Sequence, residues 1–410
     1  MAVKIGGKNI IASSLYPKEG NPLWEEYSTR VVAHTLKVYS KYTFDYPYPK
    51  AVSVHSKNQG MEYPMICWNY GRPNEDGSYS DRTKYGMISV IIHEVGHNFF
   101  PMIVNSDERQ WGWMDEGLDS FVQYLTEQEF EEDYPSRRGD PSKIVRYMSG
   151  DQDFISPIMS NPENVFQLGP NAYSKPATAL NILRETIMGP ELFDFSFKTY
   201  AKRWKFKHPT PEDFFRTMED ASAVDLDWFW RGWFYSTDVV DIGVKSVDNY
   251  VISDKPSKEI DSILAKYGMT ANDLNPTVFM QKNTKEFKES SEMESDSISS
   301  FEALDISLGD DKKLPKHFYE IQFEKPGGLV MPIIVDYIYE DGTKERIEYP
   351  VQIWRKNDSI VKRVITSDKK LIGVELDPDA ETADINLNNN SWPVKKNISD
   401  FDKFKEKIKG

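Results

Sequence analysis

Apolar residues recur at helical spacing through the first 240 residues of the chain. Several segments place them three or four positions apart, which is the spacing of one buried face of an amphipathic helix. The predicted helices span residues 23–42, 177–188, 193–204, 211–223 and 226–235. Asn21-Pro22 is typical of an N-cap followed by proline in the first helical turn. Residues 1–20 are turn-rich, and we expect turns rather than regular elements there.

From residue 318 the apolar positions change from helical spacing to alternation, which is typical of β-strands. Asp341-Gly342, between two such runs, is a strong hairpin signal. The predicted strands span residues 319–323, 330–339, 343–349, 351–354, 360–365 and 373–376. Short strands at this spacing predict a small β-sandwich. One earlier strand is predicted at residues 51–55.

These patterns predict an α+β protein, mainly helical, in four parts. Residues 1–250 form the helical domain, residues 251–317 an acidic linker, residues 318–393 the β-sandwich and residues 394–410 a basic tail. The linker assignment depends on a Ser- and Glu-rich stretch at 286–300, which offers little apolar surface to bury.

The apolar run 87–100 contains the sequence His93-Glu94-Val95-Gly96-His97. On a helix, His93 and His97 lie one turn apart on the same face. Two imidazoles so placed can bind one Zn²⁺, and Glu94 beside them can take a proton from water at the metal. Two core histidines in a buried helix would give the same pattern, so a third ligand is needed to distinguish the two interpretations.

Glu116 is the candidate for that third ligand. It lies in Asp115-Glu116-Gly117, at the start of a second segment with helical periodicity. Its distance along the chain from His97 suits a helix, a loop and an antiparallel helix that returns to the same metal. Two neutral imidazoles and one carboxylate leave a fourth position open, which is the catalytic arrangement of zinc.

Two further features of the metal-binding helix concern its packing. Asp81 is the predicted cap of this helix. Gly96 lies inside it and costs about 1 kcal/mol of helix propensity relative to Ala. We interpret this glycine as a point of close packing against a neighbour.

Composition narrows the possible partners. The net charge of −15 argues against nucleic acid, because phosphate binding needs a basic surface. Hydrophobic residues make up 39% and charged residues 28%, as in a soluble globular protein. Cys67 is the single cysteine, so no intrachain disulfide can form.

No charged-then-apolar leader opens the chain, and no apolar run approaches the ~20 residues of a membrane helix. We expect either a cytosolic protein or one whose upstream sequence lies outside this chain.

Two other segments of the sequence contain candidate functional residues. Gly60-Met61-Glu62 follows the predicted strand 51–55 and is either a strand-edge turn or an edge along which a peptide substrate lies. Tyr173 stands just before the predicted helix 177–188, where a phenol can point into a cleft. From the residues alone, an ordinary partly buried tyrosine is the simpler interpretation of Tyr173.

Taken together, these motifs resemble the aminopeptidase N-type gluzincin family of zinc metallopeptidases. The resemblance depends on four motifs: Gly60-Met61-Glu62, His93-Glu94-Val95-Gly96-His97, Glu116 and Tyr173. They follow one another along the chain in the same order as in the family, and the resemblance covers roughly residues 20–240. It implies a thermolysin-like catalytic domain followed by a small β domain. The family's large N-terminal β domain has no counterpart in the sequence given. Gln59 and Tyr63 stand where the family usually has Gly and Asn.

The resemblance also implies roles for individual residues. His93, His97 and Glu116 match the ligands of one zinc ion, and Glu94 matches the general base. Glu62 matches the glutamate that binds the free α-amine of the substrate, within the Gly60-Met61-Glu62 motif. Tyr173 matches the tyrosine that donates a hydrogen bond to the oxyanion.

The implied reaction is hydrolysis of N-terminal peptide bonds in peptides with a free N-terminus. Two alternatives stay open at this point. One is a zinc endopeptidase with a cleft open beyond the substrate's N-terminus, and the other is an inactive peptide-binding module.

Overall fold

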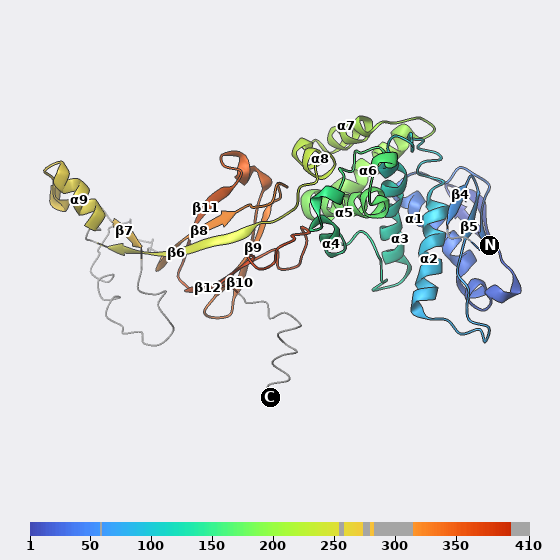
Figure 1. Cartoon of the computed structure of the whole chain (residues 1–410), viewed down its shortest axis with the longest axis horizontal. Coiled ribbons are helices and arrows are strands. Elements are labelled where there is room, and N and C mark those ends of the chain that lie inside the picture. Colours follow the sequence, from blue (N-terminus) through green and yellow to red (C-terminus); the bar gives the residue numbers. More distant parts are fainter. Residues whose placement is uncertain (58–59, 254–257, 274–278, 283–314, 395–410) are drawn as a thin grey trace. The chain divides into compact units, whose positions relative to one another are not determined.

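The computed structural model describes the whole chain except residues 58–59, 254–257, 274–278, 283–314 and 395–410 (Figure 1). The chain divides into two compact units. The first unit comprises residues 1–240, 328–330 and 380–385, and the second comprises residues 241–327, 331–379 and 386–410. The α+β class is confirmed. The four-part division stays a prediction, because the Ser- and Glu-rich stretch and nearly all of the tail lie outside the described residues.

A five-stranded sheet forms the N-terminal part of the first unit, in the order β1-β2-β3-β5-β4. Its strands are β1 (Ala2–Ile5), β2 (Lys8–Leu15), β3 (Lys50–His55), β4 (Met61–Tyr63) and β5 (Ile66–Asn69). The strand predicted at 51–55 is therefore confirmed, but the expectation of turns over residues 1–20 is wrong. The side chains of Val3, Ile5, Ile10 and Ala12 alternate into the core, which is the period-two signal of a strand.

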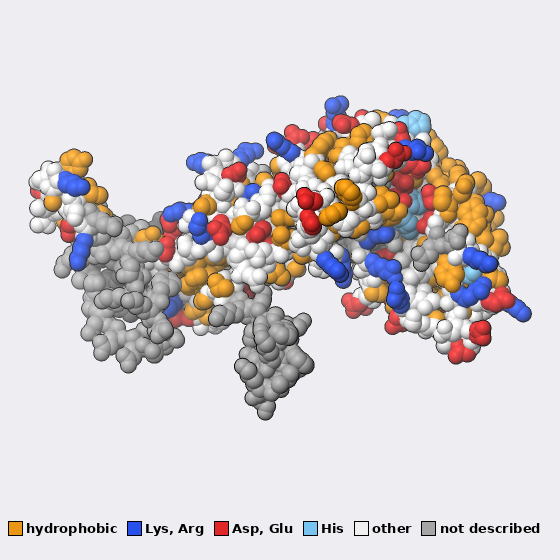
Figure 2. All heavy atoms as spheres, viewed as in Figure 1, with side chains coloured by type: hydrophobic (Ala, Val, Ile, Leu, Met, Phe, Trp, Pro, Cys, Tyr) orange, Lys and Arg blue, Asp and Glu red, His pale blue; other side chains and the backbone are white. Residues whose placement is uncertain are grey.

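One edge of this sheet is the short strand β4, whose one partner among the described residues is β5, in antiparallel pairing. Met61 and Tyr63 on this strand are largely exposed. Figure 2 shows hydrophobic side chains gathered at the end of the first unit where β4 and β5 lie. The free edge leaves backbone N–H and C=O groups of β4 available to an added strand.

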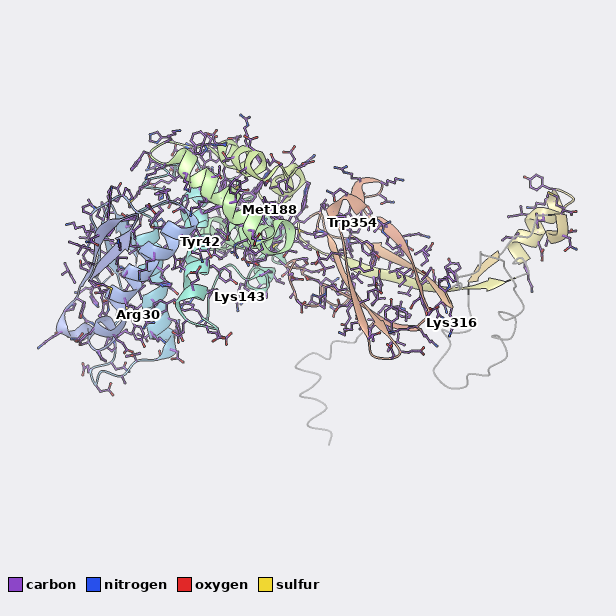
Figure 3. The ribbon with its side chains drawn as sticks, turned by 180° about the vertical axis from the view of Figure 1, so that it is seen from behind. Arg30, Tyr42, Lys143, Met188, Lys316 and Trp354 are labelled. Atoms are coloured by element: carbon purple, nitrogen blue, oxygen red, sulfur yellow. The ribbon has the colours of Figure 1, made fainter. Side chains whose placement is uncertain are left out.

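Helices make up most of the rest of the first unit. Their bounds are α1 (Thr29–Tyr42), α2 (Asp81–Gly96), α3 (Leu118–Phe130), α4 (Val145–Met148), α5 (Lys175–Ile182), α6 (Pro190–Trp204), α7 (Pro211–Ser222) and α8 (Asp227–Trp233). Helix α2 contacts both α1 and α3, and α1 and α2 pack against the sheet. Figure 3 labels Arg30 and Tyr42 near the two ends of α1.

The cap of α2 differs from the prediction. Ser80, not Asp81, is the N-cap, and its hydroxyl accepts a hydrogen bond from the backbone N–H of Thr83 at 3.2 Å. Ser80 has the extended backbone that an N-cap requires, whereas Asp81 is already helical. The negative charge of Asp81 still lies favourably in the first turn.

The second unit contains two antiparallel four-stranded sheets, in the orders β10-β9-β12-β13 and β11-β8-β6-β7. Its elements are β6 (Gly243–Ser253), α9 (Lys258–Lys266), β7 (Phe279–Lys282), β8 (His317–Glu324), β9 (Ile333–Tyr339), β10 (Lys344–Tyr349), β11 (Ile360–Ser367), β12 (Leu371–Leu376) and β13 (Ser391–Trp392). The hairpin at Asp341-Gly342 is confirmed, and Gly342 has a φ of 80°. Whether the two sheets form a β-sandwich stays a prediction.

The strand predicted at residues 351–354 is wrong. Residues Val351–Arg355 form a 3₁₀ helix that follows Pro350. Trp354 is buried there, and its indole N–H donates a hydrogen bond to the carbonyl of Met331 at 2.9 Å. Anchoring of this large side chain outweighs the alternating pattern. Among the described residues, every helix is too short or too polar to cross a membrane.

Candidate metal centre

Three side chains from two separate segments meet in the first unit. The Nε2 atoms of His93 and His97 lie 3.1 Å apart. Oε2 of Glu116 lies 3.1 Å from Nε2 of His93 and 3.4 Å from Nε2 of His97. The structure therefore brings the three predicted ligands together around one point.

Local structure explains how α2 supplies two of these groups. His93 lies in the last turn of α2, and His97 is its C-cap with a helical φ of −55°. The backbone N–H of His97 still donates to the carbonyl of His93 at 3.1 Å. The two rings therefore keep the one-turn spacing that the sequence predicted, although the α-helix itself ends at Gly96.

Glu116 is held by a π-helical turn, Trp113–Gly117, that leads directly into α3. Trp113 anchors this turn, because its ring stacks on Phe215 and packs edge-on against Phe234 at a centroid distance of 4.8 Å. The aromatic block predicted at residues 228–234 contributes Trp230 and Phe234 to the same buried cluster. A rigid core thus fixes the position of the third predicted ligand.

The second ring nitrogens define the protonation of both imidazoles. Nδ1 of His93 lies 3.0 Å from Oε1 of Gln123, its hydrogen-bond partner, and 2.7 Å from Oδ2 of Asp119. Nδ1 of His97 lies 2.9 Å from the carbonyl oxygen of Phe100 and 3.0 Å from Oδ1 of Asp115. All these partners are acceptors, so in the neutral rings each Nδ1 carries the hydrogen and each Nε2 presents a lone pair.

A divalent cation fits this donor set. Two Nε2 lone pairs and a carboxylate oxygen that converge at 3.1–3.4 Å repel one another unless positive charge lies between them. Neighbouring donors of a tetrahedral zinc site lie about 3.3 Å apart, given Zn–N bonds of about 2.0–2.1 Å. Imidazole and carboxylate are the ligands of catalytic zinc sites. The donor set and its spacing therefore fit zinc.

The electrostatics of the pocket favour the same conclusion. Burial lowers the pKa of His93, but the charge of Asp119 together with hydrogen bonds to Asp119 and Glu116 raises this pKa overall to about 9. Burial would raise the pKa of Glu116, but hydrogen bonds from His93 and His97 hold it well below its usual range. The pocket thus stabilises positive charge at the point where the three side chains meet.

Sequence reasoning did not identify the carboxylates behind the histidines. Asp119 is fully buried, and its Oδ1 accepts a hydrogen bond from the hydroxyl of Tyr39 on α1 at 2.9 Å. Asp115 holds the other ring. Both flank Glu116 in sequence, and Asp119 lies one helical turn beyond it, which is the signal that could have revealed them. Such partners orient metal-binding histidines and raise their basicity.

Glu94 lies beside the predicted ligands and is buried. Burial, reinforced by the neighbouring carboxylate of Glu62 and opposed by the two histidines, raises its pKa to about 8. Its Oε2 atom has no hydrogen-bond partner within the described part of the chain. Three atoms, a carboxylate oxygen of Glu62, a carboxylate oxygen of Glu94 and a ring nitrogen of His97, all lie within 4.8 Å of one another.

In the Gly60-Met61-Glu62 motif, the backbone of Gly60 packs against the carboxylate of Glu94. Gly60 has a φ of 42°, and a Cβ atom added there would overlap Oε1 of Glu94. Glu62 follows on β4, the free edge of the sheet. The structure thus brings the motif to the same site as Glu94, with the exposed edge strand leading away from it.

Tyr173 also reaches the site. Its hydroxyl donates a hydrogen bond to Oε1 of Glu116 at 2.6 Å, and its ring stacks on His93 with a centroid distance of 5.7 Å. Burial and the charge of Glu116 raise the pKa of Tyr173 well above its usual value. The phenol therefore stays protonated and acts as a hydrogen-bond donor at neutral pH.

A profile of the peptidase family M1 domain matches residues 27–233, which include every residue of this site. Glutamyl aminopeptidase of Sus scrofa is 30% identical over 160 residues, which are 38% of this chain and 17% of the relative. Aminopeptidase N of Lactococcus lactis subsp. lactis is 20% identical over 243 residues, which are 55% of this chain and 28% of the relative. The chain therefore spans less than a third of the length of these curated relatives.

A solved structure shares the fold. The structure of Legionella pneumophila aminopeptidase A, in complex with aspartic acid, aligns with a TM-score of 0.56 and 13% sequence identity. The alignment covers 94% of this chain and 37% of that one. At this identity the likeness shows a shared fold.

The predicted close packing at Gly96 is confirmed and generates a test. The hydroxyl of Tyr39 and the carboxylate of Asp119 lie where a Cβ atom of residue 96 would be. We expect Gly96→Ala to lower the free energy of unfolding by about 1–3 kcal/mol, because the added methyl group overpacks this contact. Urea unfolding measures the change.

Gly86 provides the matched control, since it lies on the same helix and a Cβ atom there meets nothing within 4 Å. We expect Gly86→Ala to raise the free energy of unfolding by up to about 1 kcal/mol through helix propensity. Shifts of the same sign in both variants would contradict the packing argument.

Proposed function

The chain belongs to peptidase family M1, and from this premise we propose that it is a zinc-dependent aminopeptidase that removes residues from the free N-terminus of peptides. The observation that carries the proposal is the convergence of His93, His97 and Glu116 on one point, with Glu94, Glu62 and Tyr173 around it. The aminopeptidase names of the two relatives support the exopeptidase activity. We further propose a thermolysin-like fold for the first unit and a β-sandwich for the second.

His93, His97 and Glu116 are the proposed ligands of a single zinc ion. When bound, zinc polarises the scissile carbonyl group and makes the attacking water more acidic. The Asp119 and Asp115 carboxylates keep both histidine rings oriented with Nε2 toward the ion.

Glu94 is the proposed general base. It accepts a proton from the attacking water and then gives it to the nitrogen of the leaving peptide. Its raised pKa, about 8 in the buried pocket, suits both steps near neutral pH, because the group can hold and release a proton there.

Tyr173 is the proposed oxyanion donor. Its hydroxyl, which contacts Glu116 in this structure, donates instead to the carbonyl oxygen as negative charge develops there. The stack on His93 fixes the ring without using its hydroxyl group. A preorganised donor of this kind contributes about 3–4 kcal/mol to transition-state stabilisation.

Glu62 sets the register of cleavage. Its carboxylate pairs with the ammonium group of the substrate, while the backbone of β4 adds hydrogen bonds to the extended peptide. One carboxylate oxygen of Glu62 lies within 4.8 Å of one carboxylate oxygen of Glu94, so the proposed amine site and the proposed general base are neighbours.

Glu94→Gln tests the general base. We expect this variant to bind zinc as the wild type does but to lose on the order of 10²–10⁴-fold in kcat, because the amide cannot carry the proton. Hydrolysis of leucine p-nitroanilide and zinc content by mass spectrometry measure the two effects. Glu116→Gln is the contrasting variant and is expected to lose zinc and activity together. Near-normal turnover by Glu94→Gln would end its assignment.

A blocked N-terminus tests the exopeptidase assignment. We expect a peptide with a free α-amine to be hydrolysed from its N-terminus, and the acetylated peptide to resist cleavage, because Glu62 then lacks a cationic partner. Glu62→Gln should raise KM for the free peptide more than about tenfold, from the loss of one charge-assisted contact. Glu75→Gln, at an exposed position, serves as the control. Equal cleavage of both peptides would instead identify an endopeptidase.

A further inference from the structure

Arg138 reaches the site from the segment that follows α3. Two side chains of this segment, Ser136 and Arg138, contact α3. Ser136 donates a hydrogen bond to Glu127, and Nη1 of Arg138 lies 3.4 Å from the hydroxyl of Ser120. Arg137, between these two, is exposed. The next residue, Gly139, has a φ of 92° and packs against the ring of Tyr124, which fixes the end of the segment.

The guanidinium of Arg138 lies over the ring of Tyr173, with 4.5 Å between its central carbon and the ring centroid. Burial lowers the pKa of Arg138, and the nearby Tyr173 and Glu116 oppose that shift. The long contact with Ser120 is the one hydrogen bond that this side chain makes among the described residues. Most of its five donors therefore have no protein acceptor.

Arg138 lacks the ion pair that two other arginines of this chain make. Arg184 makes two hydrogen bonds of 2.7 and 2.9 Å to Asp194, and Arg346 pairs with Asp336 in the same two-pronged way. No carboxylate oxygen of the described residues lies within 4.0 Å of Arg138. Arg138 is partly buried. A partly buried cation without an anion is unfavourable, so we expect its anion to come from a ligand.

We propose that Arg138 binds a carboxylate group of the substrate and so gives the enzyme a preference for substrates that carry one. The inference rests on the proposed aminopeptidase function. A guanidinium presents paired N–H donors that match a carboxylate. The other ionisable groups around the predicted ligands are acidic, including Glu62, Glu94, Asp115 and Asp119. Among the charged side chains of the site outside the predicted ligands, Arg138 is therefore the one that attracts a substrate carboxylate.

Two parts of a peptide offer this group. One is the C-terminal carboxylate of a short peptide, and the other is an acidic side chain. The alternative role for Arg138 is to hold the ring of Tyr173 through the cation–π contact alone. That role would affect all substrates alike, whereas carboxylate binding affects only those that carry the group.

The experiment measures kcat/KM for two substrate pairs. Alanyl-alanine and its C-terminal amide test the terminal carboxylate, and glutamyl and glutaminyl p-nitroanilides test the side chain. For the wild type we expect the carboxylate member of one pair to be favoured by about 10- to 100-fold, the scale of one charge-assisted contact. The pair that shows the preference identifies the source of the carboxylate.

Arg138→Gln is expected to bring the kcat/KM ratio of that pair close to one. Arg138→Lys is expected to retain part of the preference, because lysine keeps the positive charge but lacks the paired N–H donors of the guanidinium. Arg137→Gln removes the same charge from the exposed neighbour and should leave the ratio unchanged. Zinc content, measured in each variant, verifies that the site is intact.

Two results would overturn the inference. The first is a wild-type kcat/KM ratio near one for both pairs. The second is an equal loss of kcat/KM on all substrates in Arg138→Gln, which would show that Arg138 supports the ring of Tyr173. Wild-type hydrolysis of neutral leucine p-nitroanilide distinguishes these failures from failure of the proposed function, because that substrate carries no carboxylate.

Discussion

The convergence of three lone pairs is the interaction on which the rest of the site depends. Nε2 of His93, Nε2 of His97 and Oε2 of Glu116 face one another at 3.1–3.4 Å. With the hydrogen of each neutral ring on Nδ1, these three lone pairs repel one another unless positive charge lies between them. The protein stabilises that charge twice, first through the three donors and then through the buried acids behind them. A cation held at this point would account for the concentration of buried acidic groups here.

The surrounding fold supplies rigidity at each of these points. Helix α2 carries His93 and its C-cap residue is His97, and the Trp113 cluster fixes the turn that carries Glu116. Asp119 then links α3 to α1 through Tyr39 and to α2 through His93. Gly96 is the residue that lets these three helices approach, since a side chain there would separate them. Packing and metal chemistry thus share the same few contacts.

The sequence predicted the elements of this site better than their surroundings. Helical spacing placed His93 and His97 on one face, because that spacing follows from the geometry of the helix alone. The positions of Asp119 and Arg138 depend on which helices and segments pack together, and one sequence does not contain that information. The same holds for Trp354, whose burial outweighs a strand-like pattern. The first two strands are different, since their alternating core positions were present in the sequence and were interpreted as turns.

The most direct test of the account is X-ray absorption spectroscopy at the zinc edge, on the whole chain after dialysis against one equivalent of zinc. The account predicts one tightly held zinc ion per chain, with two imidazole nitrogens and carboxylate oxygen in its first shell, and loss of the imidazole signal in His93→Ala and His97→Ala. A chain that retains no zinc, or one whose zinc spectrum is unchanged in both variants, would contradict it.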